Sequence, residues 1–474
     1  MRIAAELRGW VCALMMLGLA AGWSPASAGK LEDVLLENKQ ITVEQWIQLK
    51  ADEEKRQAKQ VEESRGTSDL PLRERWYEKI SIRGYTQFRY NHAIENDLLR
   101  NPGDRSIAGN NEFFIRRARL IISGQPHERV FFYFQPSFEG LIGGVEQSGV
   151  VRDLYADLFL TQNKEWRIRA GLSKVPYGFE NMQSSQNRLA LDRNDALNSA
   201  VPIERDLGVY LYYTPTAVRE RFKRLVDSGL KGSGDYGMLG IGAYNGQGNN
   251  IRDRNKNKHV VFHAMYPYEF PNGQIIQVGM DAYTGEFNVG ASPVVPVSPA
   301  PGTNGAPIAP LLHNGGNYRD ERVAWHFVIF PQPFGLQGEY TIGRGPELNQ
   351  ARTEITSGSL SGGYIQLFYN YRCDSFCQNI VPYVRYQEYF GGRKSEANAP
   401  RNSVREYEFG VEYQLNKAFE FTVAYAWGQR TSNDASTVPA SCANIDLPTR
   451  PSCSLTPYQL QTGNLLRFQL QWNF

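Results

Sequence analysis

Residues 464–474 read NLLRFQLQWNF, and from Leu466 onward apolar and polar side chains alternate. Successive side chains of a β-strand point to opposite faces of a sheet. This segment therefore predicts a strand with an apolar environment on one face and water on the other. Its edge would be uncovered and its outer face would include Trp472 and Phe474. Two settings fit the alternation: a sandwich strand over a soluble core, or a strand of a closed membrane barrel with lipid outside and water inside.

The first 28 residues, MRIAAELRGWVCALMMLGLAAGWSPASA, favour the membrane setting. Arg2 and Arg8 form a positive start, an apolar core follows from about Trp10 to Ala21, and the small residues ASA end at Ala28. This order is typical of a secretory signal peptide. The apolar run is too short for a transmembrane helix, so we expect a mature chain that begins near Gly29.

The composition narrows the possible classes of protein. The chain has 474 residues and a net charge of +2, and removal of Arg2, Arg8 and Glu6 with the signal peptide leaves 49 basic against 48 acidic residues. This balance does not suggest a nucleic-acid partner. The mature chain has no run of about 18 apolar residues, which excludes a helical membrane protein. A secreted soluble β protein or an outer-membrane barrel remains.

The number and spacing of alternating segments predict an all-β fold, a 16-stranded antiparallel transmembrane β-barrel. The segments lie near 80–90, 111–123, 129–138, 151–161, 165–174, 206–214, 236–245, 257–269, 273–287, 318–331, 334–345, 361–373, 378–390, 403–415, 418–430 and 462–474. Short turns such as QNKE and LNKA alternate with mostly longer loops. Bacterial outer-membrane barrels show this asymmetry, with the short turns in the periplasm. Residues 215–235 do not fit, because they are too long for a tight turn and carry a basic helical patch.

The domain organisation follows from these segments. We expect a signal peptide at 1–28, a short helical extension at 29–65, a linker at 66–78 and the barrel at 79–474. Within the extension, Thr42 is placed to cap a helix with Gln45 three residues later. The barrel places the protein in the outer membrane of a Gram-negative-type bacterium, with membrane lipid as its partner.

Arginines on the early strands are expected to line the lumen. They alternate with apolar residues in segments such as SIRGYTQFRY, RRARLIIS and EWRIRAGL. An arginine that faces lipid at the bilayer midplane costs about 2–4 kcal/mol, so these side chains are predicted to face inward. The predicted pore-lining residues are Arg83, Arg89, Arg117, Arg119, Arg167 and Arg169.

Acidic residues are expected on the opposite wall. By the same alternation, Glu406, Glu408 and Glu412 face inward on a late strand, opposite to Phe409 and Val411. A basic wall across from an acidic wall would create a transverse field through the pore. An equally weighted alternative is a set of salt ladders between adjacent strands, with partners such as Asp153 and Asp157 on the fourth segment.

The cysteines and histidines point to disulfides rather than to catalysis or cofactors. Four cysteines remain after signal cleavage, and an even count in an exported chain suggests nearest-neighbour pairs. The candidates are Cys373 with Cys377 and Cys442 with Cys453. The spacing CDSFC is not a zinc motif, no C-x-x-C-H haem motif is present, and no histidine lies in a recognisable Ser-His arrangement. We therefore expect no enzyme activity, no metal and no cofactor.

Several motifs resemble the phosphate-selective porin family, the porin O and P group. They are IRGYTQFRY, FFIRRARLIISG, FFYFQPSFEG and especially RAGLSKVPYGFE. In that family the last motif leads from a strand into a long loop that folds inward and narrows the pore, which here would include Gly171, Pro176, Gly178 and Phe179. The resemblance implies a homotrimer, and it places residues 29–65 in the periplasm as an amphipathic or coiled-coil extension. It also assigns the following charged residues to this constriction loop: Lys174, Glu180, Arg188, Asp192, Arg193, Asp195, Glu204 and Arg205.

The sequence thus predicts a porin for passive diffusion of small hydrophilic solutes, with a preference for small anions. Phosphate selectivity transfers less cleanly, because Lys174 is the only lysine between Trp166 and Arg221 and carboxylates accompany the loop arginines. The competing hypothesis is a structural or adhesive outer-membrane protein with a closed lumen, whose long loops serve binding.

Overall fold

The computed structural model describes residues 42, 76–95, 111–139, 148–291, 316–350, 354–373, 376–433 and 459–474. The chain divides into two units, Met1–Arg75 and Trp76–Phe474. Because Thr42 is the single described residue of the first unit, the predicted signal peptide, helical extension and most of the linker lie outside the described residues. None of the helices in the described ranges is long and apolar enough to cross a bilayer.

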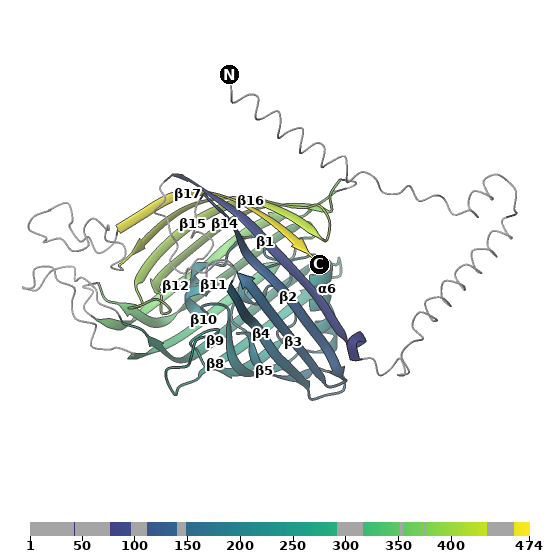
Figure 1. Ribbon diagram of the computed structural model, residues 1–474, viewed down its shortest axis with the longest axis horizontal. Helices are drawn as coiled ribbons and strands as arrows, with labels where there is room; N and C mark the ends of the chain where they lie inside the picture. Colours follow the sequence, from purple (N-terminus) through teal and green to yellow (C-terminus); the bar gives the residue numbers. More distant parts are fainter. Residues whose placement is uncertain are drawn as a thin grey trace, which may run out of the picture. The chain divides into compact units, whose positions relative to one another are not determined.

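The second unit is a closed antiparallel barrel, which confirms the predicted fold (Figure 1). A short 3-10 helix, η2 (Trp76–Lys79), precedes the first strand, and helices α4 (Phe179–Met182), α5 (Asp195–Ala200) and α6 (Thr216–Asp227) lie between strands. The strands are β1 (Ile80–Glu95), β2 (Phe113–His127), β3 (Val130–Glu139), β4 (Ser148–Phe159), β5 (Trp166–Lys174), β6 (Arg205–Tyr213), β7 (Leu239–Tyr244), β8 (His259–Glu269), β9 (Ile275–Val289), β10 (Gly316–Ile329), β11 (Phe334–Leu348), β12 (Ile355–Tyr369), β13 (Tyr371–Arg372), β14 (Asn379–Gly392), β15 (Arg401–Gln414), β16 (Phe419–Ser432) and β17 (Gln459–Asn473).

Sixteen of these seventeen β elements are barrel strands, and each pairs with its neighbours in the chain. The exception, β13, is a two-residue continuation of the β12 side that pairs with β14. The ring closes where β17 pairs with β1 over Tyr85↔Asn473 to His92↔Leu466. This pairing covers the strand edge that the sequence left open at residues 464–474, so the barrel, not a sandwich, explains the alternation.

The two faces of the wall follow the predicted alternation. On β15, Phe409 and Val411 are exposed on the outside, whereas Glu408 and Glu412 are buried inside the barrel. The same holds on β17, where Leu470 is exposed and Gln469 and Gln471 are buried. Apolar side chains therefore meet lipid and polar side chains meet the lumen, as membrane barrels require.

A disulfide joins Cys373 to Cys377 in the turn between β13 and β14, with Cα atoms 5.4 Å apart. This confirms the first predicted cysteine pair, and Cys442 and Cys453 lie outside the described residues. We expect mass spectrometry of unreduced peptides to recover both the 373–377 and the 442–453 cross-links. Alkylation of all four thiols without prior reduction would contradict both pairings.

Candidate functional site

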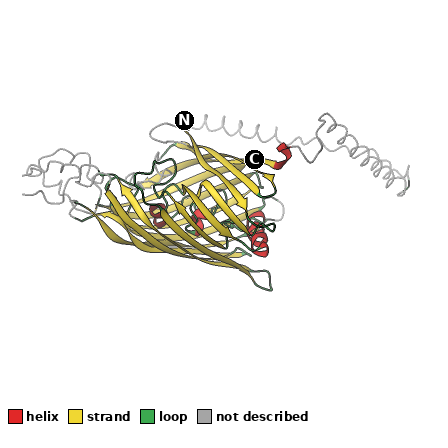
Figure 2. Cartoon of the chain, turned by 90° about the horizontal axis from the view of Figure 1, so that it is seen from below, coloured by secondary structure: helices red, strands yellow, loops and turns green. Residues whose placement is uncertain are grey.

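A long loop between β5 and β6 lies inside the barrel. We call residues 175–204 the inner loop; it contains α4 and α5, and Figure 2 shows short helices enclosed by the strands. Its apolar residues Tyr177, Phe179 and Leu197 are fully buried. They pack against the interior of the wall, for example through the edge-on contact of Tyr177 with Tyr283 of β9. The sequence between β5 and β6 therefore fills part of the lumen.

Hydrogen bonds from backbone amides fix the start of the inner loop to strands β9 and β11. The amide of Gly178 donates to Asp281 Oδ2 of β9 at 2.8 Å, and the amide of Glu180 donates to Glu339 Oε2 of β11 at 3.2 Å. Gly178 has φ +81°, and a Cβ atom there would approach Leu197 Cδ1 to 2.5 Å. A glycine is thus required at this position both by its backbone conformation and by the close packing.

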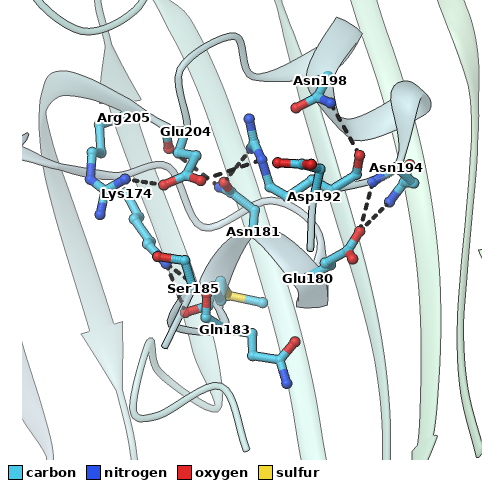
Figure 3. Close-up of polar contacts among 12 residues, drawn as sticks. Lys174, Glu180, Asn181, Gln183, Ser185, Asp192, Asn194, Asn198, Glu204 and Arg205 are labelled. Carbon is cyan, nitrogen blue, oxygen red and sulfur yellow. Dashed lines mark hydrogen bonds and ion pairs between the residues drawn. The ribbon is translucent and has the colours of Figure 1, made fainter. Parts of the chain in front are cut away.

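The carboxylate of Glu180 joins the two halves of the inner loop to β14. It accepts hydrogen bonds from Arg385 Nη1 at 2.6 Å and Nη2 at 3.1 Å, so the ion pair is bidentate. It also accepts bonds from the backbone and side-chain nitrogens of Asn194, both at 2.9 Å (Figure 3). Asn194 in turn caps α5 by accepting from the Leu197 amide at 2.9 Å. One buried side chain therefore positions both helices.

Two further carboxylates of the inner loop bind arginines of the wall. Asp195 pairs with Arg393 and with Arg430 Nη2 at 3.2 Å. Asp192 pairs with Arg89 at 3.1 Å, with Arg116 at 3.3 Å and with Arg467. Burial alone would raise the pKa of Asp192, but the nearby Arg89, Arg467 and Arg116 guanidinium groups bring that pKa well below its usual range. Asp192 is therefore ionised and holds three arginines together.

The other charged residues predicted for the constriction loop also lie at the inner loop and its flanking strand ends. Lys174 donates to the carbonyl oxygens of Met182 and Gln183, at 3.3 and 2.8 Å. Arg193 lies 3.4 Å from Glu204, which also contacts Arg205 (Figure 3). Arg188 is buried, and its Nε and Nη2 atoms have no hydrogen-bond partner among the described residues.

The six predicted pore-lining arginines differ in their surroundings. Arg117 donates to the neutral Gln87 at 2.7 Å, and Arg119 donates to Tyr85 at 2.9 Å and to Ser185 at 3.0 Å. By contrast, Arg169 pairs with Asp157 of the adjacent strand at 2.7 Å, as the salt-ladder alternative describes. Arg167 likewise pairs with Asp235 at 2.8 Å. Arg89 belongs to the Asp192 cluster, and Arg83 shares the inward parity but is exposed near the start of β1.

The acidic wall is less uniform than the sequence suggested. Glu408 accepts from Tyr383 at 2.6 Å and lies 3.6 Å from Arg467, while Glu412 pairs with Lys231 at 2.5 Å. Glu406 accepts a bond from Gln387 at 2.7 Å. The same side of the barrel also carries the inward arginines of β14, β16 and β17, each paired with a carboxylate of the inner loop: Arg385, Arg430 and Arg467.

The alternation of the sequence did not predict that Arg116 and Arg152 face the lumen, because β-bulges turn these two residues inward. The β1–β2 register shifts between Gln87 and Phe88 and skips Arg116. The β3–β4 register shifts between Gln135 and Pro136 and skips Arg152. A bulge lets two successive residues face the same side. The available signal was the adjacency of Arg116 with Arg117 and of Arg152 with Asp153, since one of each pair would otherwise face lipid.

These elements line a cavity of roughly 290 Å³, which is bordered by the inner loop, by strands β2 and β4 and by residues 393–396 after β14. Its lining contains six arginines, namely Arg116, Arg117, Arg119, Arg152, Arg193 and Arg393. Three carboxylates accompany them, namely Asp192, Glu204 and Glu396. The cavity thus has a surplus of positive charge, in a place where a solute inside the barrel would meet both the wall and the inner loop.

The chain is similar to known outer-membrane porins in sequence and in fold. The family described as phosphate-selective porin O and P matches residues 88–446. Among solved structures, the chain is similar to the outer-membrane channel DcaP of Acinetobacter baumannii, with 13% identity, a TM-score of 0.47, and coverage of 83% of this chain and 97% of that one. It is also similar to an anion-selective porin from Comamonas acidovorans, with 10% identity, a TM-score of 0.46, and coverage of 83% and 99%. No curated protein sequence matches the chain.

Proposed function

This chain belongs to the phosphate-selective porin O and P family and forms a water-filled channel in the outer membrane of Gram-negative bacteria, and we propose that anions pass it more readily than cations. Membership of a porin family favours an open channel over the closed-lumen adhesive protein. Porins are channels rather than enzymes, so we assign no catalytic residue.

The charge of the cavity is the observation that carries the anion preference. Six arginines face three carboxylates there, and one of them, Arg117, donates to the neutral side chain of Gln87. Fixed positive charge raises the local concentration of anions, and screening limits the effect to about 8–10 Å at physiological ionic strength. Guanidinium groups also bind oxyanions such as phosphate through two parallel hydrogen bonds. The carboxylates oppose this field, so the preference is expected to be moderate.

The test is the reversal potential in a planar bilayer under a salt gradient, measured with chloride and repeated with phosphate. Substituting Arg117→Gln together with Arg119→Gln is expected to shift the reversal potential toward cations, because two charges leave the cavity. The barrel should remain folded, since lumen changes tune selectivity more than stability. Arg319→Gln is a matched control, because Arg319 is exposed on β10 and pairs with Glu321. An unchanged reversal potential in folded double-mutant channels would contradict the proposal.

Assembly and processing complete the proposed function. We propose that the porin forms a homotrimer, with residues 1–28 removed on export and residues 29–65 as a helical periplasmic extension joined by the linker 66–78. Support for the trimer is the family resemblance of the sequence motifs. Chemical cross-linking of the detergent-extracted protein is expected to give a species of three chains.

A further inference from the structure

The connection between β6 and β7 differs from the other turns at its end of the barrel. Residues 215–238, which we call the strap, contain α6, and Figure 1 shows α6 at the end of the barrel where the C terminus lies. Other turns at this end are short, such as residues 128–129 between β2 and β3. Short turns face the periplasm in barrels of this kind, so the strap lies at the periplasmic mouth.

The apolar face of α6 packs inward rather than against lipid. Val218 and Phe222 form a buried cluster with Met182 of the inner loop and Met265 of β8. Further along the strap, Leu225 and Leu230 belong to a second buried cluster, which contains Phe179 of the inner loop and three residues of the β9–β10 side: Ile275, Val328 and Phe330. The strap therefore supports the inner loop from the periplasmic side.

Polar contacts show that the strap crosses the mouth. Near its end, Asp235 Oδ2 pairs with Arg167 Nη1 of β5 at 2.8 Å. At its middle, Lys231 Nζ pairs with Glu412 Oε1 of β15 at 2.5 Å. Around the ring, β5 and β15 are separated on one side by β4, β3, β2, β1, β17 and β16. On the other side they are separated by the strands from β6 to β14. A segment that contacts β5 and β15 therefore spans nearly opposite walls.

The strap is also joined to the inner loop by a direct hydrogen bond. Gln183 Nε2 donates to the carbonyl oxygen of Lys231 at 2.7 Å. At the start of α6, the amide of Thr216 donates to Glu165 Oε1 at 2.9 Å, which fixes the helix to the turn between β4 and β5. Both ends and the middle of the strap are thus held, so its position across the mouth is determined by the fold.

We propose that the strap is a second constriction, on the periplasmic side of the inner loop, with Lys231 as its charge determinant. The lumen beside it is acidic: Glu412 and Glu420 lie on neighbouring strands, and Lys231 contacts the first of them. The Lys231 ammonium group offsets this negative charge on the exit path. The role of Lys231 rests on the proposed anion preference, whereas the constriction itself needs only an open channel.

The first experiment replaces residues 216–236 by a short turn and measures single-channel conductance and the size limit for neutral sugars in liposome swelling. A rise in both is expected for a folded, heat-modifiable barrel. Lys223→Ala is the matched control, because this α6 side chain is 76% exposed and pairs with Asp227 of the same helix. Wild-type conductance and size limit in the shortened, folded variant would overturn the second constriction.

A second experiment does not depend on the folding of the shortened chain. Lys231→Met is expected to shift the reversal potential toward cations, and Lys231→Met combined with Glu412→Gln is expected to restore the wild-type value, because the double change leaves the net charge of the mouth unaltered. A wild-type reversal potential in Lys231→Met channels would overturn the charge role of Lys231. If Arg117→Gln/Arg119→Gln shifts the potential and Lys231→Met does not, the strap inference fails while the proposed anion preference stands.

Discussion

Replacing Glu180 by leucine is expected to release the inner loop from the wall and to give larger, noisier single-channel currents. Glu180 is fully buried and binds Arg385 and Asn194. Removing one partner of a buried ion pair costs about 3–5 kcal/mol, because the remaining charge is left uncompensated. That cost falls on the contact that positions α4 and α5, so the inner loop should become sensitive to proteases while the barrel stays heat-modifiable.

Two controls separate the ion pair from general damage to the lumen. Glu180→Leu combined with Arg385→Leu removes both charges, and since an apolar pair often replaces a buried ion pair without loss, quieter currents should return. Glu396→Gln changes a carboxylate at the cavity, which pairs with Arg393 at 3.4 Å and is 21% exposed, and should leave the noise unchanged. Quiet, wild-type currents from Glu180→Leu channels would show that other contacts hold the inner loop.

Substituting Gly84 by valine is expected to impair closure of the barrel. Gly84 exchanges two backbone hydrogen bonds with Phe474, of 2.8 and 3.0 Å, at the β1–β17 seam. A Cβ atom at Gly84 would lie 2.4 Å from Phe474 Cζ and 2.5 Å from the carbonyl oxygen of Arg119. Overpacking of this kind costs about 1–3 kcal/mol, and a loss of 1–2 kcal/mol changes a folding equilibrium by a factor of about 5–30. The measurement is the folded fraction on unheated gels.

Gly149→Val is the matched control for the seam. Gly149 also lies in a strand, β4, but a Cβ atom there would lie 3.6 Å from the Phe138 ring, an ordinary contact distance. Deleting Phe474 removes the two seam hydrogen bonds without adding bulk and should act in the same direction as Gly84→Val. Equal folded fractions for Gly84→Val and Gly149→Val would show that the seam tolerates the displacement.

The barrel was predictable from the sequence because its signal is local. Alternation along residues 464–474 assigned the inward and outward faces of β17 without any knowledge of its neighbours. The same reasoning placed Glu408 and Glu412 inside. Boundaries were less accurate: β12 begins at Ile355, before the predicted 361, because serine and glycine residues such as Ser357 and Gly358 weaken the apolar alternation.

The site was harder to predict because its geometry depends on contacts between distant segments. Arg116 and Arg152 face the lumen only because the register shifts against neighbouring strands, which one strand cannot reveal. The pairing of Glu180 with Arg385 joins residues 205 positions apart. The strap was visible as an anomaly of length and charge, but its reach to Glu412 depends on how the barrel closes.

The Asp192 cluster has a consequence for the closure of the barrel. This one carboxylate binds Arg89 of β1, Arg116 of β2 and Arg467 of β17, so it touches both strands of the seam where the barrel closes. One carboxylate of the inner loop therefore serves both strands of the seam, and its ion pairs join the first and last strands across the point of closure. We expect this shared partner to stabilise the closed ring, in addition to the backbone hydrogen bonds between β1 and β17.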